Sequence, residues 1–365
     1  MAASATSPAP CSRRTETPPR PIDRQQETWT ANKKLGRTSH MIPLSKSLAA
    51  VLACVIGLST ASAAMAADTY PSRPVTMIVP FGAGGGTDVI ARTVSDELSR
   101  ALGQSIVVEA RPGANGAIGS AVVARAVPDG YTLLFTAQST YSLNPNLMKD
   151  PLFDQLKDLV PVASIGRSPW LIAVPMESEF KSLADVVAYG KANPGKLVFP
   201  FWQSSVLVTG ETFGRMADIR MRKVPYKGQV EANTDFLGGR LPLMVTDIAG
   251  GRAPVEAGKM RLLASTTAKR SAAFPDVPTM REQGLDVVTD SMLAVFAPAG
   301  TPQPILDRLN QEVSRIVLGS EKVRDRLRQL GLEPTVMTQN EADAFVRSEM
   351  TRWEEMIRRA GLQKE

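Results

Sequence analysis

Cysteine and histidine are nearly absent from this 365-residue chain, which has two cysteines, Cys11 and Cys54, and one histidine, His40. All three precede residue 67, after which strand-like and helix-like patterns alternate to the end. The part from residue 67 onward therefore cannot form a Ser-His-Asp triad, a cysteine nucleophile, a Cys/His zinc site or a disulfide. An enzyme would have to rely on carboxylates, lysine, tyrosine or a hard metal, so the composition disfavours catalysis.

An apolar run long enough to cross a membrane is also lacking. Residues 48–58 are apolar, but a spanning helix needs about 20 residues. Lys46 precedes this run and Ala64-Met65-Ala66 follows it, which is the order of a secretory signal peptide and its cleavage site. We therefore expect residues 41–66 to be a signal peptide that directs a soluble chain to the periplasm. The alternative of a lipid on Cys54 is disfavoured because the next four residues are still apolar.

The first forty residues differ from the rest of the chain. They are rich in proline, serine, threonine and arginine and show no periodic apolar pattern, which predicts a disordered extension. We interpret residues 1–40 as lying upstream of the true translation start at Met41.

The positive net charge depends on the same N-terminal part. The whole chain carries +6, but residues 1–66 hold eight of the 42 basic and three of the 36 acidic residues, which leaves 34 against 33. A nearly neutral mature chain lacks the basic excess that nucleic-acid binding uses, so we expect no nucleic-acid partner. The remaining 299 residues are enough for two domains, each with its own core.

One stretch combines a strand, a glycine-rich turn and the start of a helix. Residues 75–79 have strand character, four glycines follow within residues 82–86, and apolar residues recur every fourth position from Ile90 to Leu102. Glycines leave backbone amides accessible, and a helix N-terminus carries a partial positive charge. The loop is therefore suited to holding a small anion.

The spacing argues against a nucleotide phosphate. A Rossmann fingerprint needs a third glycine, and a Walker loop needs a lysine, at the position of Thr87. A carboxylate can be held by neutral amides and hydroxyls alone, so we expect a small organic carboxylate. The simpler alternative is a tight turn in which Asp88 only caps the helix. Several adjacent glycines cost conformational entropy that a plain turn does not require, which favours the ligand role.

Polar side chains follow three other predicted strands, and open α/β sheets place ligands at such strand ends. The alternation of strands and helices also predicts parallel pairing. The strand at residues 132–136 leads into a polar loop around Thr136, Gln138 and Ser139. The strand at residues 197–201 is followed by Gln203, Ser204 and Ser205, and the strand at residues 243–245 is followed by Asp247.

Helix signals occupy the segments between these strands and the whole tail. A capping box opens a helix at Ser182 and another opens a helix at Thr338. Further helices are predicted at residues 118–127, from about Thr209, at 230–237, at 305–316 and at 323–330, and further strands at 106–109, 171–174, 222–224 and 292–296.

Together these residues resemble the extracytoplasmic solute receptors of tripartite tricarboxylate transporters, the Bug-type proteins. The resemblance covers residues 68–365 and rests on an ordered set of motifs. They include Pro80-Phe81-Gly82-x-Gly84-Gly85-x-Thr87-Asp88, Arg111-Pro112-Gly113-Ala114, Pro128-Asp129-Gly130-Tyr131, Ala192-Asn193-Pro194-Gly195, Val224-Pro225-Tyr226-Lys227-Gly228, Pro275-Asp276-Val277-Pro278 and Ala297-Pro298-Ala299-Gly300.

The resemblance implies a periplasmic-binding-protein fold: two α/β lobes, joined by two crossing strands, with a ligand cleft between them. It implies a lobe of residues 68–170 plus 286–365 and a second lobe of residues 171–285. It also implies a monomer without cofactor, metal or catalysis that delivers its ligand to membrane permease subunits. The implied ligand contacts in the first lobe are Phe81, Gly82, Ala83, Gly84, Gly85, Thr87 and Asp88, completed by Thr136, Gln138 and Ser139.

The second lobe would contribute Gln203, Ser204 and Ser205, with Asp247 at the cleft. Here the chain departs from the family pattern, because the loop after Phe201 is about two residues shorter and lacks the usual histidine. Trp202 stands in this shortened loop, and it would give the pocket a flat apolar wall. We therefore predict a carboxylate with an apolar or aromatic body rather than a tricarboxylate. The alternative for Trp202 is ordinary core packing.

Two other functions remain open from the sequence. One is a periplasmic sensor subunit that binds a similar solute and reports to a two-component kinase. The other is a carboxylate- or metal-dependent enzyme in which Asp88 and Asp247 act as acid and base.

Overall fold

The computed structural model describes residues 70–364. The expected extension, residues 1–40, and the expected signal peptide, residues 41–66, lie outside the described residues. Within residues 70–364, no helix combines the length and the apolar character that a membrane crossing requires.

Three parallel strands open the first lobe. β1 (Val75–Val79) pairs with β2 (Ile106–Ala110) on one side and with β3 (Thr132–Ala137) on the other. α2 (Gly86–Leu102) connects β1 to β2, and α3 (Ala117–Ala124) precedes β3. These elements match the predicted ones, except that α3 ends three residues earlier.

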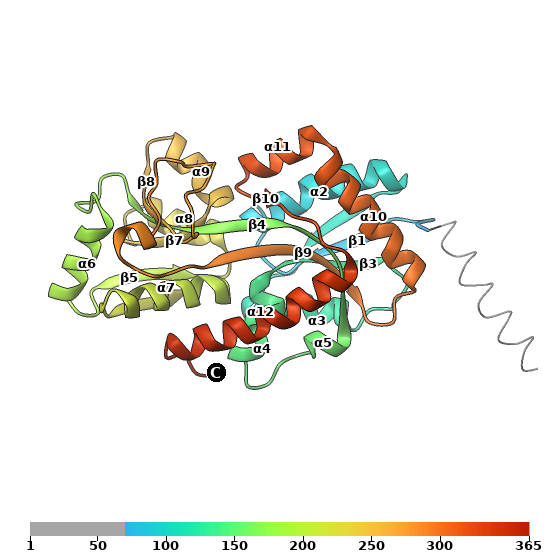
Figure 1. Ribbon diagram of the computed structural model, residues 1–365, viewed down its shortest axis with the longest axis horizontal. Helices are drawn as coiled ribbons and strands as arrows, with labels where there is room; N and C mark the ends of the chain where they lie inside the picture. Colours follow the sequence, from blue (N-terminus) through green and yellow to red (C-terminus); the bar gives the residue numbers. More distant parts are fainter. Residues whose placement is uncertain (1–69, 365) are drawn as a thin grey trace, which may run out of the picture. The chain divides into compact units, whose positions relative to one another are not determined.

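Two long strands cross between the lobes, as expected (Figure 1). β4 (Leu159–Pro175) pairs antiparallel with β9 (Asp290–Pro298) along its first half. Its second half pairs antiparallel with β7 (Met244–Asp247) and β8 (Met260–Ser265). The sequence predicted only the last part of β4. Pro161 and Gly166 interrupt the apolar pattern of its first half, and the β4–β9 register shifts next to each of them.

The second lobe repeats the strand-helix pattern. β5 (Leu197–Phe201) and β6 (Met221–Pro225) are parallel. Around them lie α6 (Leu183–Ala192), with the predicted capping box, and α7 (Ser204–Met216), α8 (Gln229–Leu237) and α9 (Ile248–Glu256). The prediction that α7 begins near Thr209 was wrong, because Gln203 already serves as its N-cap. Parallel pairing thus holds within each lobe, whereas the crossing strands are antiparallel.

Each lobe has its own hydrophobic core. One apolar cluster joins β1 and α2 to the helices α10 (Gln303–Gly319) and α11 (Glu321–Gln329). A second cluster contains only residues between Trp170 and Val287, with Leu285 and Leu362 packed against it. The short strand β10 (Glu333–Pro334) adds to the edge of β4 after α11.

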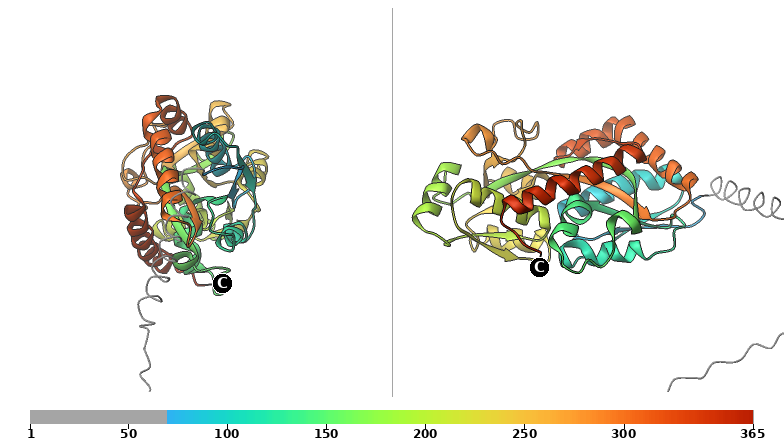
Figure 2. Two further views of the ribbon diagram at one scale, coloured as in Figure 1. Left: turned by 90° about the vertical axis from the view of Figure 1, so that its right-hand side faces the viewer. Right: turned by 60° about the horizontal axis from the view of Figure 1, so that its bottom comes forward.

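The helix α12 (Gln339–Arg359) contacts both lobes. It begins at the predicted capping box of Thr338, and Val346 packs on first-lobe residues. Further along, Trp353 and Ile357 pack against Val208 of α7 together with the short helix α4 (Asn144–Leu147), which is followed by α5 (Gln155–Asp158). In Figures 1 and 2, α12 runs past the crossing strands from one lobe to the other.

Candidate functional site

The glycine loop connects β1 to α2, and its shape depends on Gly84 and Asp88. Gly84 has a φ of +75°, which glycine adopts without strain. Its N–H donates to Asp88 Oδ2 at 2.9 Å, and Arg92 donates to both carboxylate oxygens at 2.9 and 3.0 Å. Asp88 therefore fixes the loop and is neutralised by Arg92. Arg92 was not predicted, although a charge pair four residues apart on a helix was visible in the sequence.

The start of α2 meets the second lobe directly. The N–H of Gly86 donates to Gln229 Oε1 at 2.9 Å, and Gln229 Nε2 donates to Asp247 Oδ1 at 3.0 Å. A Cβ atom on Gly86 would lie only 2.6 Å from Asp247 Oδ2, so glycine is required for this approach. Gln229 was missed because it stands at the first position of α8, where the sequence pattern indicates no special role.

Asp247 is a half-buried carboxylate between two helix starts. Its Oδ1 accepts from Gly250 N at 2.7 Å as the N-cap of α9. Burial raises the pKa of Asp247, while the hydrogen bonds from Gln229 and Gly250 work in the opposite direction. The adjacent N-terminus of α2 favours a negative charge at this place.

A second contact between the lobes lies at the start of α7. Ser139 Oγ donates to Gln203 Oε1 at 3.1 Å, and Ser204 Oγ donates to Asn144 Oδ1 at 2.5 Å. Ser205 Oγ is buried and has no hydrogen-bond partner among residues 70–364. The structure thus brings Ser139, Gln203 and Ser204 together and leaves one hydroxyl beside them unpaired.

The predicted polar loop at residues 138–140 is not a loop. Ser139 opens η2 (Ser139–Leu143), a turn of π-helix that leads into α4. Such turns are frequent at functional sites, but their wide spacing gives no clear apolar period in a sequence. Thr140 belongs to this turn, and its Oγ1 lies 2.5 Å from Oγ1 of Thr136 in β3.

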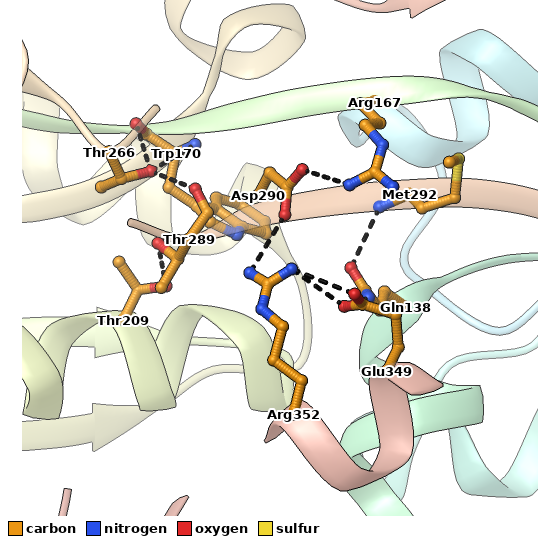
Figure 3. Close-up of polar contacts among 10 residues, drawn as sticks. All are labelled: Gln138, Arg167, Trp170, Thr209, Thr266, Thr289, Asp290, Met292, Glu349 and Arg352. Atoms are coloured by element: carbon orange, nitrogen blue, oxygen red, sulfur yellow. Dashed lines mark hydrogen bonds and ion pairs between the residues drawn. The ribbon is translucent and has the colours of Figure 1, made fainter. Parts of the chain in front are cut away.

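Gln138 belongs to a polar network at the crossing strands rather than to the contact between Ser139 and Gln203 (Figure 3). Its amide nitrogen donates to Glu349 Oε2, and its oxygen accepts from Met292 N at 3.3 Å. Arg352 joins Glu349 at 3.1 Å to Asp290 at 3.5 Å. Both ends of the Gln138 amide are therefore bound within the protein.

The two aromatic residues of the predicted site are largely buried in the cores. Phe81 is 7% exposed in the first cluster, and Trp202 is 7% exposed in the second. Stacking of a ligand on Trp202 stays a prediction. Ala83 and Gly84 are exposed, whereas Gly85, Thr87 and Asp88 are buried, and Gly82 is intermediate. Among residues 70–364, no three acidic or histidine side chains are grouped as metal ligands.

Comparison with known sequences points to one family. The sequence model described as "Tripartite tricarboxylate transporter family receptor" matches residues 90–362. A UPF0065 protein of Bordetella bronchiseptica is 38% identical over 296 residues, which are 81% of this chain and 88% of that protein. Protein BugT of Bordetella pertussis is 35% identical over 86% of this chain and 97% of its own length.

Solved structures agree with the sequence comparison. An R. palustris protein solved with adipate has a TM-score of 0.79 and 33% identity, covering 81% of this chain and 100% of that one. The periplasmic binding protein BugD has a TM-score of 0.77 and 31% identity, covering 81% and 100%. MatC from Rhodopseudomonas palustris, solved with malate, has a TM-score of 0.74 and 30% identity, covering 79% and 100%. The matched family is one of receptors and not of enzymes. The likeness to these solved structures confirms the predicted fold of two lobes with crossing strands. The chain belongs to the family of tripartite tricarboxylate transporter receptors, the Bug-type solute-binding proteins.

Proposed function

We propose that the protein captures a small organic carboxylate in the periplasm and delivers it to the membrane permease of a tripartite tricarboxylate-type transporter. One observation carries the proposal: the N–H of Gly86, at the start of α2, already holds a side-chain oxygen from the opposite lobe. A ligand carboxylate has the same acceptor chemistry with more negative charge, which the helix N-terminus favours.

In this proposal the ligand takes the place of Gln229 Oε1 at Gly86. The amides of Gly84 and Gly85 are already bonded, to Asp88 and to Gly82 O respectively. Gly86 is thus the amide of the loop whose partner comes from the other lobe. The unpaired hydroxyl of Ser205, beside the Ser139–Gln203 contact, supplies a donor for the other end of the ligand.

The ligand class follows from the size of the charge that the site can neutralise. Arg92 is engaged by Asp88, and Asp247 lies beside Gly86, so a trianionic ligand would meet few free positive charges. Relatives solved with adipate and malate both hold linear dicarboxylates. A mono- or dicarboxylate with an apolar or aromatic body, stacking on Trp202, therefore fits this chain better than citrate.

Titration of the purified protein with adipate, malate, citrate and an aromatic acid tests the ligand class. Calorimetry gives the affinity, and the difference in tryptophan fluorescence between the wild-type protein and Trp202→Ala reports on Trp202, because the other tryptophans contribute to both. We expect the apolar or aromatic acid to bind best, and Trp202→Ala to weaken it by about 1 kcal/mol or more. Tight binding of citrate alone, unchanged in Trp202→Ala, would contradict the proposed ligand class.

Delivery to a transporter is tested separately. Uptake of the identified acid into cells should fall when the receptor is removed and return when it is supplied again. Purified receptor with ligand should be retained by immobilised permease subunits. Retention by a sensor kinase instead of a permease would overturn the delivery role and leave the binding role intact.

A further inference from the structure

A basic cavity lies at the crossing strands, apart from the glycine loop. Its volume is about 660 Å³, within the range of small-molecule sites. None of the predicted ligand residues lines it. Gly331, one of the residues that line it, packs against Ile248 of α9.

Five cationic side chains from both lobes line this cavity. Arg167 comes from β4 and Arg328 from α11, whereas Arg252 comes from α9 and Lys269 and Arg270 from the segment after β8. In Figure 1, α9 and α11 lie on the same side of β4. The cavity is therefore a place where two lobes present positive charge to one another.

Few negative charges balance these five within the cavity. Asp290 pairs with Arg167 at 2.8 Å, and Glu333 is the other acidic lining residue. Arg270 and Arg328 pair with acids outside the lining at 3.0 and 3.5 Å, in exposed ion pairs that contribute little. Lys269 forms no ion pair within the part of the chain that is described.

Arg252 is only weakly neutralised. Its guanidinium lies over Phe274 and reaches Glu256 at 3.3 Å in a partly exposed ion pair. Such pairs contribute little, so the charge of Arg252 is available to an anion in the cavity.

We propose that this cavity is a second binding site, for a small anion with two or more negative charges such as a polyphosphate. An anion there would touch cationic groups of both lobes at once. Its occupancy favours the arrangement in which the lobes are in contact, and by linkage the ligand at the glycine loop binds more tightly when the anion is present. The last step rests on the proposed carboxylate function, but the anion site itself does not.

Calorimetric titration of the full chain with pyrophosphate, at low ionic strength, tests the site. We expect pyrophosphate to bind. The double variant Lys269→Gln, Arg328→Gln should bind about tenfold or more weakly, because two charge-assisted contacts are lost. The variant Lys149→Gln, Arg100→Gln loses the same charge outside the cavity and should bind as the wild-type protein does.

The variant Gly84→Val distinguishes binding in the cavity from binding at the glycine loop. It should lose the carboxylate ligand and keep pyrophosphate binding. The proposal is overturned if pyrophosphate does not bind, if the Lys149→Gln, Arg100→Gln control weakens equally, or if Gly84→Val abolishes pyrophosphate binding. Binding of poly-glutamate without any small-anion binding would also overturn it, in favour of an acidic protein partner.

Discussion

At the scale of single residues, Gly86 sets how closely the lobes approach at the glycine loop. A methyl group there would meet Asp247 at 2.6 Å, so Gly86→Ala should hold the lobes apart while leaving each core intact. We expect a larger radius of gyration by small-angle X-ray scattering and a weaker ligand affinity.

Gly319→Ala is the control, since a Cβ there meets only Arg315 at 3.9 Å. A Gly86→Ala protein with unchanged scattering and unchanged affinity would show that the contact with Asp247 does not govern the approach of the lobes.

Asp247 should make stability depend on pH in an unusual direction. Burial raises its pKa, so the folded protein holds the proton more tightly than the unfolded chain, and stability falls as the pH rises through the folded pKa. Asn keeps the cap but cannot ionise. We expect Asp247→Asn to have a higher Tm than the wild-type protein at pH 7, with the difference shrinking as the pH falls towards 4.

Asp185 is a control because its pKa is shifted in the opposite direction to that of Asp247. Hydrogen bonds with the backbone N–H of Lys181 and with the side chain and backbone of Ser182 lower its pKa, so its contribution to stability is present at neutral pH and is lost as the pH falls. Asp185→Asn should therefore have a lower Tm at pH 7. If both variants shift the Tm in the same direction, the proposal that the pKa of Asp247 is raised in the folded protein is contradicted.

At the scale of secondary-structure elements, α12 carries the buried Glu349 against the crossing strands. Glu349 joins Gln138 to Arg352, and Arg352 reaches Asp290. Glu349→Ala would leave the Gln138 amide without its acceptor, and we expect a loss of about 2 kcal/mol in the free energy of unfolding. Urea denaturation measures it.

The matched control is Glu355→Ala on the same helix. Glu355 is partly exposed and pairs with the exposed Arg358 and Arg359, so its removal should leave the urea midpoint unchanged. Equal losses in the two variants would mean that helix propensity, not the network, explains the effect of Glu349→Ala.

Elements whose apolar residues recur at a regular spacing were predictable from the sequence. Elements that depend on irregular backbone geometry or on pairing with a distant strand were not. β1, α2 and β5 follow from apolar spacing and capping. The first half of β4 contains Pro161 and Gly166 and depends on its pairing with β9. The turn of π-helix that begins at Ser139 has no regular spacing of apolar residues that would indicate it in the sequence. α9 contains Pro254 near its C-terminal end, and a proline inside a helix normally breaks it, so the sequence pattern does not indicate a helix there.

Most residues of the candidate site could be located from the sequence, but the hydrogen bonds between them could not. The glycine loop and Gln203–Ser205 could be located from turn chemistry at strand ends. Gln229 could not, because its role comes from its hydrogen bonds to Gly86 and Asp247, which are distant from it in sequence. Gln138 was placed at the correct strand end, but its direction depends on Glu349, 211 residues away.

At the scale of the whole molecule, α12 adds a third connection beside the two crossing strands. A chain shortened to end at residue 337 would keep both hydrophobic clusters largely intact but lose the packing of Trp353 and Ile357 against Val208. We expect its lobes to unfold in two calorimetric transitions, whereas the complete protein unfolds in one. A single transition in the shortened chain would contradict this coupling.

The position of α12 in the sequence also has a consequence for biogenesis. It follows every other helix and strand of the described structure, so it is the last of them to be synthesised. Both lobes can assemble around their own cores before α12 is available to pack on them. Chaperones and proteases would therefore meet an intermediate with two formed lobes and an exposed apolar strip on α7 and α4, which becomes covered only when the end of the chain arrives.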